Sequence, residues 1–301
     1  MLVVAAPDDP HAEAVEANLA QSGVPYVRTS LSAWQHQAIA WSSHGPLSLR
    51  TEDGSTWSIG NSTTVWWRRP GLFDNPILGM AELDLARDEA ALMLPGSLDA
   101  ADVKWVDQPW VAARARNRLV QLACAARLGI PIPPTLVTNS ASEARNFAAC
   151  GTILAKTIST GPGLAPFVQA VEIQDLELTV NAPVFLQQLI HAEEDWRIVT
   201  IDSQCFGWRR FRQSDTAVDW RAMDPSGADF YQTRPERSVS NMAVGIQALL
   251  GLSVSVQDWL LANGRWYFLE VNPQGQWLFL EGANEVVPPA LALHLVQRSK
   301  C

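Results

Sequence analysis

The chain has 301 residues, 48% of them apolar and 18% charged, a globular composition that excludes disordered and fibrous classes. At about 100–200 residues per domain, this length predicts two or three domains. The 22 basic and 31 acidic residues give a formal net charge of −9, which argues against a general nucleic-acid-binding surface, so an anionic ligand needs a local cluster of arginine and lysine.

The N-terminal residues predict the start of a small α/β domain. Residues 2–6 (LVVAA) have the pattern of a buried strand, and Asp8 or Asp9 can cap the helix that follows. Gly23 ends this helix, and residues 25–29 predict a second strand. A strand, a helix and a strand in this order favour parallel pairing. No G-x-G-x-x-G motif is present, so the dinucleotide-binding fingerprint is absent.

Several further elements are expected before residue 130. They are a hairpin within residues 41–60, a β-rich strand at 63–67, an amphipathic helix at 80–94 and another helix at 110–129. Gly129 and Pro131 stop the last helix, and the prolines of residues 131–134 then make a stiff connection. We place a domain boundary near residue 112.

The predicted strands come closer together after residue 150. They are expected at 152–156, 184–190, 196–201, 204–211, 254–261 and 265–271. Clustered strands with helices between them indicate α+β character in this second half.

The N-terminus, the apolar runs and the cysteines predict a cytoplasmic location. The N-terminal stretch has no basic flank and its acids come too early for a secretory signal, and no apolar run reaches the roughly 18 residues of a membrane span. The cysteines at 124, 150, 205 and 301 lack C-x-x-C spacing, which disfavours a zinc site or a disulfide framework. Reduced thiols in a cytoplasm fit better.

A predicted hairpin near the C-terminus carries the clearest chemical signal. Asp258 lies on its first strand, and Glu270 and Asn272 lie on its second, where side chains two residues apart share a face. A two-residue Asn263-Gly264 loop would put Asp258 and Glu270 on opposite faces. A three-residue loop that begins at Ala262, with a bulged glycine, puts them on one face as diagonal neighbours, and we predict this longer loop.

Acids gathered on one face among apolar strand residues favour a bound cation, because they would otherwise repel each other. Ligand sets made only of oxygen point to Mg²⁺, which typically also keeps phosphate oxygens and water. An ordinary hairpin with a solvent-facing acidic side shows the same period of two, so the hairpin taken alone leaves that alternative open.

The hairpin resembles the metal-binding hairpin of the ATP-grasp superfamily, in which an acid is followed by Glu-x-Asn on the next strand. Within that superfamily, the chain is most similar to the ATP-grasp ligases that mature ribosomally made peptides, of the microviridin or graspetide type. The segments that carry the likeness are residues 65–70 (VWWRRP), 114–122, 129–136 (GIPIPPTL), 219–221 (DWR) and 268–277 (FLEVNPQGQW).

The resemblance implies an α/β fold, α+β in its second half, with three subdomains and the nucleotide between the central and C-terminal ones. The implied divisions are residues 1–112 as an N-terminal pre-ATP-grasp α/β domain, 113–188 as the central subdomain, and 189–301 as the C-terminal subdomain with the metal site. The implied cofactors are ATP and Mg²⁺, and the implied metal ligands are Asp258, Glu270 and Asn272.

The resemblance also implies roles for residues outside the hairpin. Those matching nucleotide-binding positions are Lys156 and Arg118 for the phosphates, Gln188, Leu189 and Ile190 for adenine, and Asp195 for ribose. Arg118 stands where related chains usually have lysine, and arginine keeps the charge but changes the reach. Residues 161–163 (GPG) match the loop that covers the phosphates, although a plain turn explains them equally well.

Arg197, Arg210 and Arg221 match arginines that contact the reacting phosphate or the activated carboxylate. Guanidinium groups fit both kinds of oxyanion, as an acyl phosphate intermediate would require. Surface ion pairs are the alternative explanation for Arg209 and Arg210.

The function implied is a ligase that phosphorylates Asp or Glu side-chain carboxylates of a ribosomally made precursor peptide. It would close ester or amide macrocycles with Ser, Thr or Lys side chains of the same peptide. One alternative is an amino-acid ligase that adds a free amino acid to a peptide or protein carboxylate, and another is a catalytically silent ATP- and peptide-binding module. The expected partner is the precursor peptide, with its leader and core, rather than nucleic acid or membrane, and the likeness suggests a homodimer.

Overall fold

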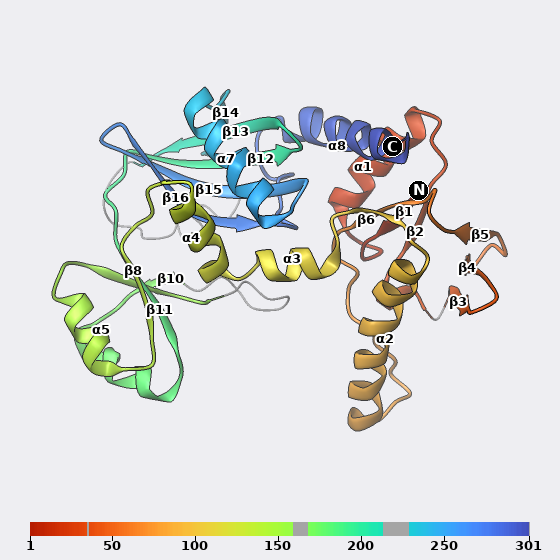
Figure 1. Cartoon of the computed structure of the whole chain (residues 1–301), viewed down its shortest axis with the longest axis horizontal. Coiled ribbons are helices and arrows are strands. Elements are labelled where there is room, and N and C mark those ends of the chain that lie inside the picture. Colours follow the sequence, from red (N-terminus) through yellow and green to blue (C-terminus); the bar gives the residue numbers. More distant parts are fainter. Residues whose placement is uncertain (35, 159–167, 213–228, 301) are drawn as a thin grey trace. The chain divides into compact units, whose positions relative to one another are not determined.

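The computed structural model describes residues 1–34, 36–158, 168–212 and 229–300. Its contacts divide the chain into two compact units, Met1–Trp110 with Asn284–Cys301, and Val111–Ala283 (Figure 1). The division into three subdomains stays a prediction. Among the described residues, no helix has both the length and the apolar run that crossing a membrane requires.

The first unit is built on a parallel sheet with the strand order β2-β1-β6-β7, as the N-terminal pattern predicts. These strands are β1 (Leu2–Val4), β2 (Val27–Thr29), β6 (Thr64–Trp67) and β7 (Lys104–Val106). Helix α1 (Pro10–Gln21) follows β1, and of the two predicted caps it is Asp9 whose side chain accepts from the backbone N–H groups of His11 and Ala12.

A smaller antiparallel sheet and three more helical segments complete this unit. The sheet contains β3 (Ala38–Ser42), β4 (Gly45–Arg50) and β5 (Thr56–Ile59), and the helical segments are η1 (Leu31–Ala33), α2 (Met80–Ala100) and α8 (Ala283–Lys300). Helix α2 runs past its predicted end at residue 94, because Pro95 is accommodated within it and the following turn buries Ser97 and Leu98.

The predicted helix at 110–129 is two helices, α3 (Pro109–Ala115) and α4 (Arg118–Arg127). The chain breaks at Asn117, whose extended backbone and side chain cap the second helix by accepting from the N–H of Leu119 at 2.9 Å. The single-helix prediction is therefore wrong, since a capping residue lies in its middle.

The second unit contains two antiparallel sheets. The first has the order β10-β9-β11-β8, with β8 (Thr135–Thr138), β9 (Ile153–Lys156), β10 (Val168–Ala170) and β11 (Val184–Gln188), and it is accompanied by α5 (Ala141–Ala148) and η2 (Ile173–Asn181). The second has the order β14-β13-β12-β15-β16, with β12 (Glu194–Ile201), β13 (Gln204–Phe211), β14 (Tyr231–Gln232), β15 (Val254–Ala262) and β16 (Arg265–Asn272).

The five-stranded sheet buries one face against α4 and α7 (Arg237–Leu250), which Figure 1 shows beside it. Trp196, Trp259 and Phe268 are at most 5% exposed in this core, and the Trp259 and Phe268 rings meet edge to face at 5.2 Å. Trp196 and Trp259 are thus core residues. Their neighbours in sequence point to the opposite face, which carries the charged side chains.

Candidate active site

The hairpin of β15 and β16 turns differently from the prediction. Ala262 pairs with Arg265, so the loop contains two residues, Asn263 with φ 50° and Gly264 with φ 72°. Two positive φ angles are typical of a type I′ turn, for which Asn-Gly is a favoured pair. The predicted three-residue loop is therefore wrong.

A β-bulge in β16 nevertheless brings the two acids to one face. Trp259 pairs with Phe268 and Asp258 pairs with Glu270, so Leu269 is the extra residue between the two pairs. In a regular ladder Asp258 would lie opposite Leu269, and the Glu270 side chain would point to the other face. The two carboxylates instead come from directly opposite residues, closer than the diagonal arrangement that we predicted.

The strand register gathers half of the predicted site residues on this face. Arg197 lies opposite Asp258, and Asp195 lies opposite Arg210. Residues directly opposite each other or two apart on one strand share a face. The shared face thus carries Asp195, Arg197, Arg210, Asp258, Glu270 and Asn272.

Each of the two predicted metal acids accepts hydrogen bonds from an arginine. Arg197 Nη1 donates to Asp258 Oδ1 at 2.7 Å, and Arg118 donates to Glu270 Oε2 through Nε at 3.0 Å and through Nη2. Arg197 is 6% exposed and Arg118 is 5% exposed, so water screens these pairs little. The predicted phosphate contact Arg118 therefore lies beside a predicted metal ligand.

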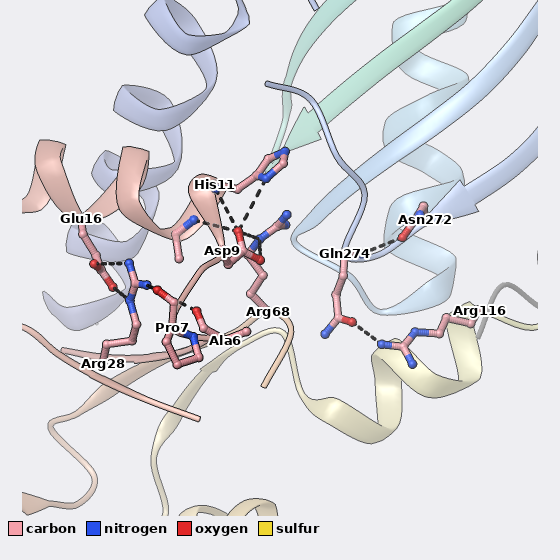
Figure 2. Close-up of polar contacts among 11 residues, drawn as sticks. Ala6, Pro7, Asp9, His11, Glu16, Arg28, Arg68, Arg116, Asn272 and Gln274 are labelled. Carbon is pink, nitrogen blue, oxygen red and sulfur yellow. Dashed lines mark hydrogen bonds and ion pairs between the residues drawn. The ribbon is translucent and has the colours of Figure 1, made fainter. Parts of the chain in front are cut away.

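Asn272 is oriented by the segment that follows β16. Its Oδ1 accepts from the backbone N–H of Gln274 at 3.1 Å, and Arg116 donates to Gln274 Oε1 (Figure 2). A carbonyl oxygen has two lone pairs, so the Asn272 amide can accept this bond and still bind a cation. The segment also holds Arg197, which donates to the carbonyl of Gln276 through Nε at 3.2 Å and through Nη2 at 3.0 Å.

The donor set fits a hard divalent cation. Two opposed carboxylates and an amide oxygen are the ligand types that Mg²⁺ prefers. Among the described residues, no group of three or more His, Cys, Asp and Glu side chains could hold a metal ion, so a cation here would need the amide oxygen and ligands from elsewhere.

Asp195 is 6% exposed and is paired with two arginines at the end of β13. Arg212 donates to Oδ1 at 2.6 Å and to Oδ2 at 3.0 Å, and Arg210 Nη1 donates to Oδ2 at 3.4 Å. Sequence reasoning missed Arg212, although it lies two residues after Arg210, a spacing that would have suggested it.

The other predicted nucleotide-binding residues lie at or directly after the ends of strands of the β10-β9-β11-β8 sheet. Lys156 ends β9, and its Nζ donates to Gln187 Oε1 at 2.7 Å. Arg118 Nη1 donates to the carbonyl and the hydroxyl of Thr157, the residue after Lys156. Because Arg118 also contacts Glu270, this side chain joins the end of β9 to the acidic hairpin.

Gln188 ends β11, and Leu189 and Ile190 follow it. The N–H of Gln188 donates to the carbonyl of Pro134, and that of Leu189 donates to the carbonyl of Thr152, both at 2.9 Å. A ligand that contacts the backbone of residues 188–190 would therefore bind a carbonyl oxygen of this segment or the N–H of Ile190. Arg221 and residues 161–163 lie outside the described part of the chain.

The Trp-Trp-Arg-Arg-Pro segment has a structural role within the first unit. Arg68 is 2% exposed, and its Nε donates to Asp9 Oδ2 at 2.9 Å (Figure 2). Burial lowers the pKa of Arg68 to about 10, so it remains charged at neutral pH. Burial opposes ionisation of Asp9, but the hydrogen bond with His11 and the charge of Arg68 hold the pKa of that carboxyl well below its usual range.

No protein-family profile matches this chain, and a search of curated proteins gives no match. Solved structures do match over almost the whole chain. A RiPP-associated ATP-grasp ligase from Chryseobacterium gregarium, in complex with ADP and a leader and core peptide, is 20% identical with a TM-score of 0.87, over 99% of this chain and 96% of that chain.

Two further structures extend this likeness. The macrocyclase MdnC from Microcystis aeruginosa MRC, bound to the precursor peptide MdnA, is 20% identical with a TM-score of 0.85, over 98% of each chain. The ATP-grasp ligase PsnB, complexed with a minimal precursor, Mg and ADP, is 21% identical with a TM-score of 0.78, over 100% of this chain and 98% of that chain. The chain therefore has the ATP-grasp fold that its sequence resemblance implies.

Proposed function

We propose that this chain is an ATP-dependent ligase that acts on a ribosomally made precursor peptide. It phosphorylates Asp or Glu side-chain carboxylates and closes ester or amide macrocycles with Ser, Thr or Lys side chains of the same peptide. The proposal is carried by the opposed acids on one sheet face and the arginines that contact them, in a fold shared with ligases solved with ADP and precursor peptides.

ATP and Mg²⁺ are the proposed cofactors. Asp258, Glu270 and Asn272 would hold the cation, which when bound would neutralise the negative charge that develops on the phosphates. Lys156, at the end of β9, and Arg118 would contact the phosphates, and Asp195 would contact the ribose. The segment Gln188, Leu189 and Ile190 would meet adenine through the backbone groups that β-pairing leaves available.

The arginines would stabilise charge in both chemical steps. In the first, a substrate carboxylate oxygen attacks the γ-phosphorus, giving an acyl phosphate and ADP. In the second, a hydroxyl or amine attacks the acyl carbon, phosphate leaves, and the nucleophile loses its proton. Arg197, Arg210 and Arg221 would face the transferred phosphoryl group and the tetrahedral oxyanion. Holding both ends of one peptide in position would supply much of the rate.

The proposed partner is the leader and core of the precursor peptide, and the proposed assembly is a homodimer. A cytoplasmic location is proposed because the reaction consumes ATP and because Cys124, Cys150 and Cys205 are free thiols. The net charge of −9 supports a peptide rather than a nucleic acid as the macromolecular substrate.

The test is mass spectrometry of a candidate precursor peptide, one rich in Thr or Ser and Asp or Glu near its end, after incubation with enzyme, ATP and Mg²⁺. Loss of one water mass per ring supports cyclisation, and Glu270→Gln should abolish it. Gain of a residue mass when a free amino acid is added would instead indicate the amino-acid ligase. An unchanged peptide with no ADP released would indicate the silent binding module.

A further inference from the structure

The two acids of the hairpin are charge-balanced by two arginines of the same unit. Arg197 pairs with Asp258, and Arg118 pairs with Glu270, with both arginine side chains almost fully buried. The arginines reach the acids from different elements, β12 and the start of α4. Each arginine thus forms an ion pair with a different acid of the hairpin.

A buried arginine competes with a divalent cation for the same carboxylate. The guanidinium uses oxygen lone pairs that a metal would need, and its positive charge repels the cation at a separation of a few ångströms. Two such arginines therefore weaken the attraction of Asp258 and Glu270 for a cation that arrives alone.

Phosphate is the alternative partner that would release both arginines. Guanidinium groups bind phosphate oxygens with the geometry that they use for carboxylates. Arg118 is placed for this exchange, because its Nη1 contacts Thr157, directly after the proposed phosphate lysine Lys156. A ligand that brings a cation and phosphates together would satisfy the acids and the arginines at once.

We infer that Arg118 and Arg197 act as positioning residues that set the order of cofactor assembly. They hold Glu270 and Asp258 as ion pairs, keep free divalent cations from these acids, and transfer to phosphate oxygens when the cation arrives with the nucleotide. This inference rests on the proposed function, since it takes a nucleotide and a cation as the ligands of this site.

The experiment measures Mn²⁺ binding to the protein through the electron paramagnetic resonance signal of the free ion, with and without ADP, after subtraction of the Mn²⁺ that the same concentration of ADP binds in the absence of protein. Wild-type protein should bind Mn²⁺ alone at least about tenfold more weakly than it does with ADP. Arg118→Gln and Arg197→Gln should each bind Mn²⁺ alone about tenfold more tightly than wild type, because a repelling charge is gone. The same variants should bind ADP, in the presence of Mn²⁺, about tenfold more weakly.

Three controls assign the effect. Arg145→Gln removes one positive charge from the exposed Arg145–Glu177 pair of the same unit and should change neither affinity. Arg118→Lys keeps the charge and should leave binding of Mn²⁺ alone close to that of wild type. In the double variant Arg118→Gln/Glu270→Gln, the gain should disappear, because the carboxylate that binds the ion has been removed.

The outcomes separate this inference from the proposed function. If Mn²⁺ binds with ADP but the folded arginine variants lose affinity in both assays, the arginines are structural and the inference is overturned. Equal wild-type affinities for Mn²⁺ with and without ADP would overturn it without any variant. If wild type fails to bind Mn²⁺ with ADP and Glu270→Gln changes nothing, the proposed function itself fails at this site.

Discussion

Replacing Gly275 with alanine should disturb the site through the backbone that holds Arg197. A Cβ at Gly275 would lie 2.4 Å from Cβ and 2.6 Å from Cγ2 of Val256 on β15. Carbon atoms in contact are ordinarily about 3.5–4.0 Å apart, so the segment after β16 would have to withdraw by about 1 Å. The Gln276 carbonyl accepts from Arg197 at 3.0 and 3.2 Å, and a shift of that size breaks both hydrogen bonds.

Overpacking of this kind lowers the free energy of unfolding by about 1–3 kcal/mol, and a displacement of about 1 Å at a reacting centre costs about 100-fold in rate. Urea denaturation followed by circular dichroism measures the free energy of unfolding, and ADP release with a precursor peptide measures the rate. Gly96→Ala is the matched control, because an added Cβ there meets nothing within 4 Å, and it should stabilise α2 by about 0.5–1 kcal/mol. Wild-type stability and rate in the Gly275→Ala protein would refute this reasoning. Adding Val256→Gly, which removes the clashing side chain, should partly restore the rate of the Gly275→Ala protein.

The remaining predictions concern the first unit and the hairpin. Arg68→Met should lower the free energy of unfolding by about 3 kcal/mol in urea denaturation, because it leaves the buried Asp9 carboxylate without its guanidinium partner. The depressed pKa of Asp9 means that its stabilising effect is present at neutral pH and lost as the pH falls below about 4, so acid titration of stability should be shallower in that variant. Asn263→Ala should cost about 1 kcal/mol in thermal melts, because φ is 50° there, whereas Asn263→Gly should be tolerated.

Local signals were sufficient for much of the fold. The first strand, its capped helix and the second strand follow from a buried apolar run, Asp9 and Gly23, which act within a few residues of themselves. Six strands of the second unit, β9, β11, β12, β13, β15 and β16, follow from β-rich runs in the same way, whereas β8, β10 and β14 were not predicted. The break between α3 and α4 at Asn117 also has a local cause. A capping residue before a new apolar stripe is the sequence signal that would have predicted it.

The hairpin shows why two sound local arguments can conflict. Asn263-Gly264 favours a two-residue turn, which in a regular ladder would put Asp258 opposite Leu269. A shared face for Asp258 and Glu270 instead requires the pairing to be shifted by one residue. The predicted three-residue loop meets only the second requirement, whereas the bulge at Leu269 allows both. Keeping both requirements would have predicted a bulge somewhere before Glu270, since no regular ladder satisfies them together.

The ion pairs of the site lay beyond sequence reasoning because they join distant residues. Arg118 and Glu270 are 152 positions apart, and their contact depends on how the start of α4 lies beside β16. A lysine at position 118 would present one point charge on a flexible stem. The arginine offers Nε and Nη2 to Glu270 while Nη1 contacts Thr157, so one planar group spans two strands. Arginine at this position therefore couples the proposed metal ligand Glu270 to the residue after β9, the strand that ends at the proposed phosphate lysine Lys156, and a simple phosphate contact would not require this.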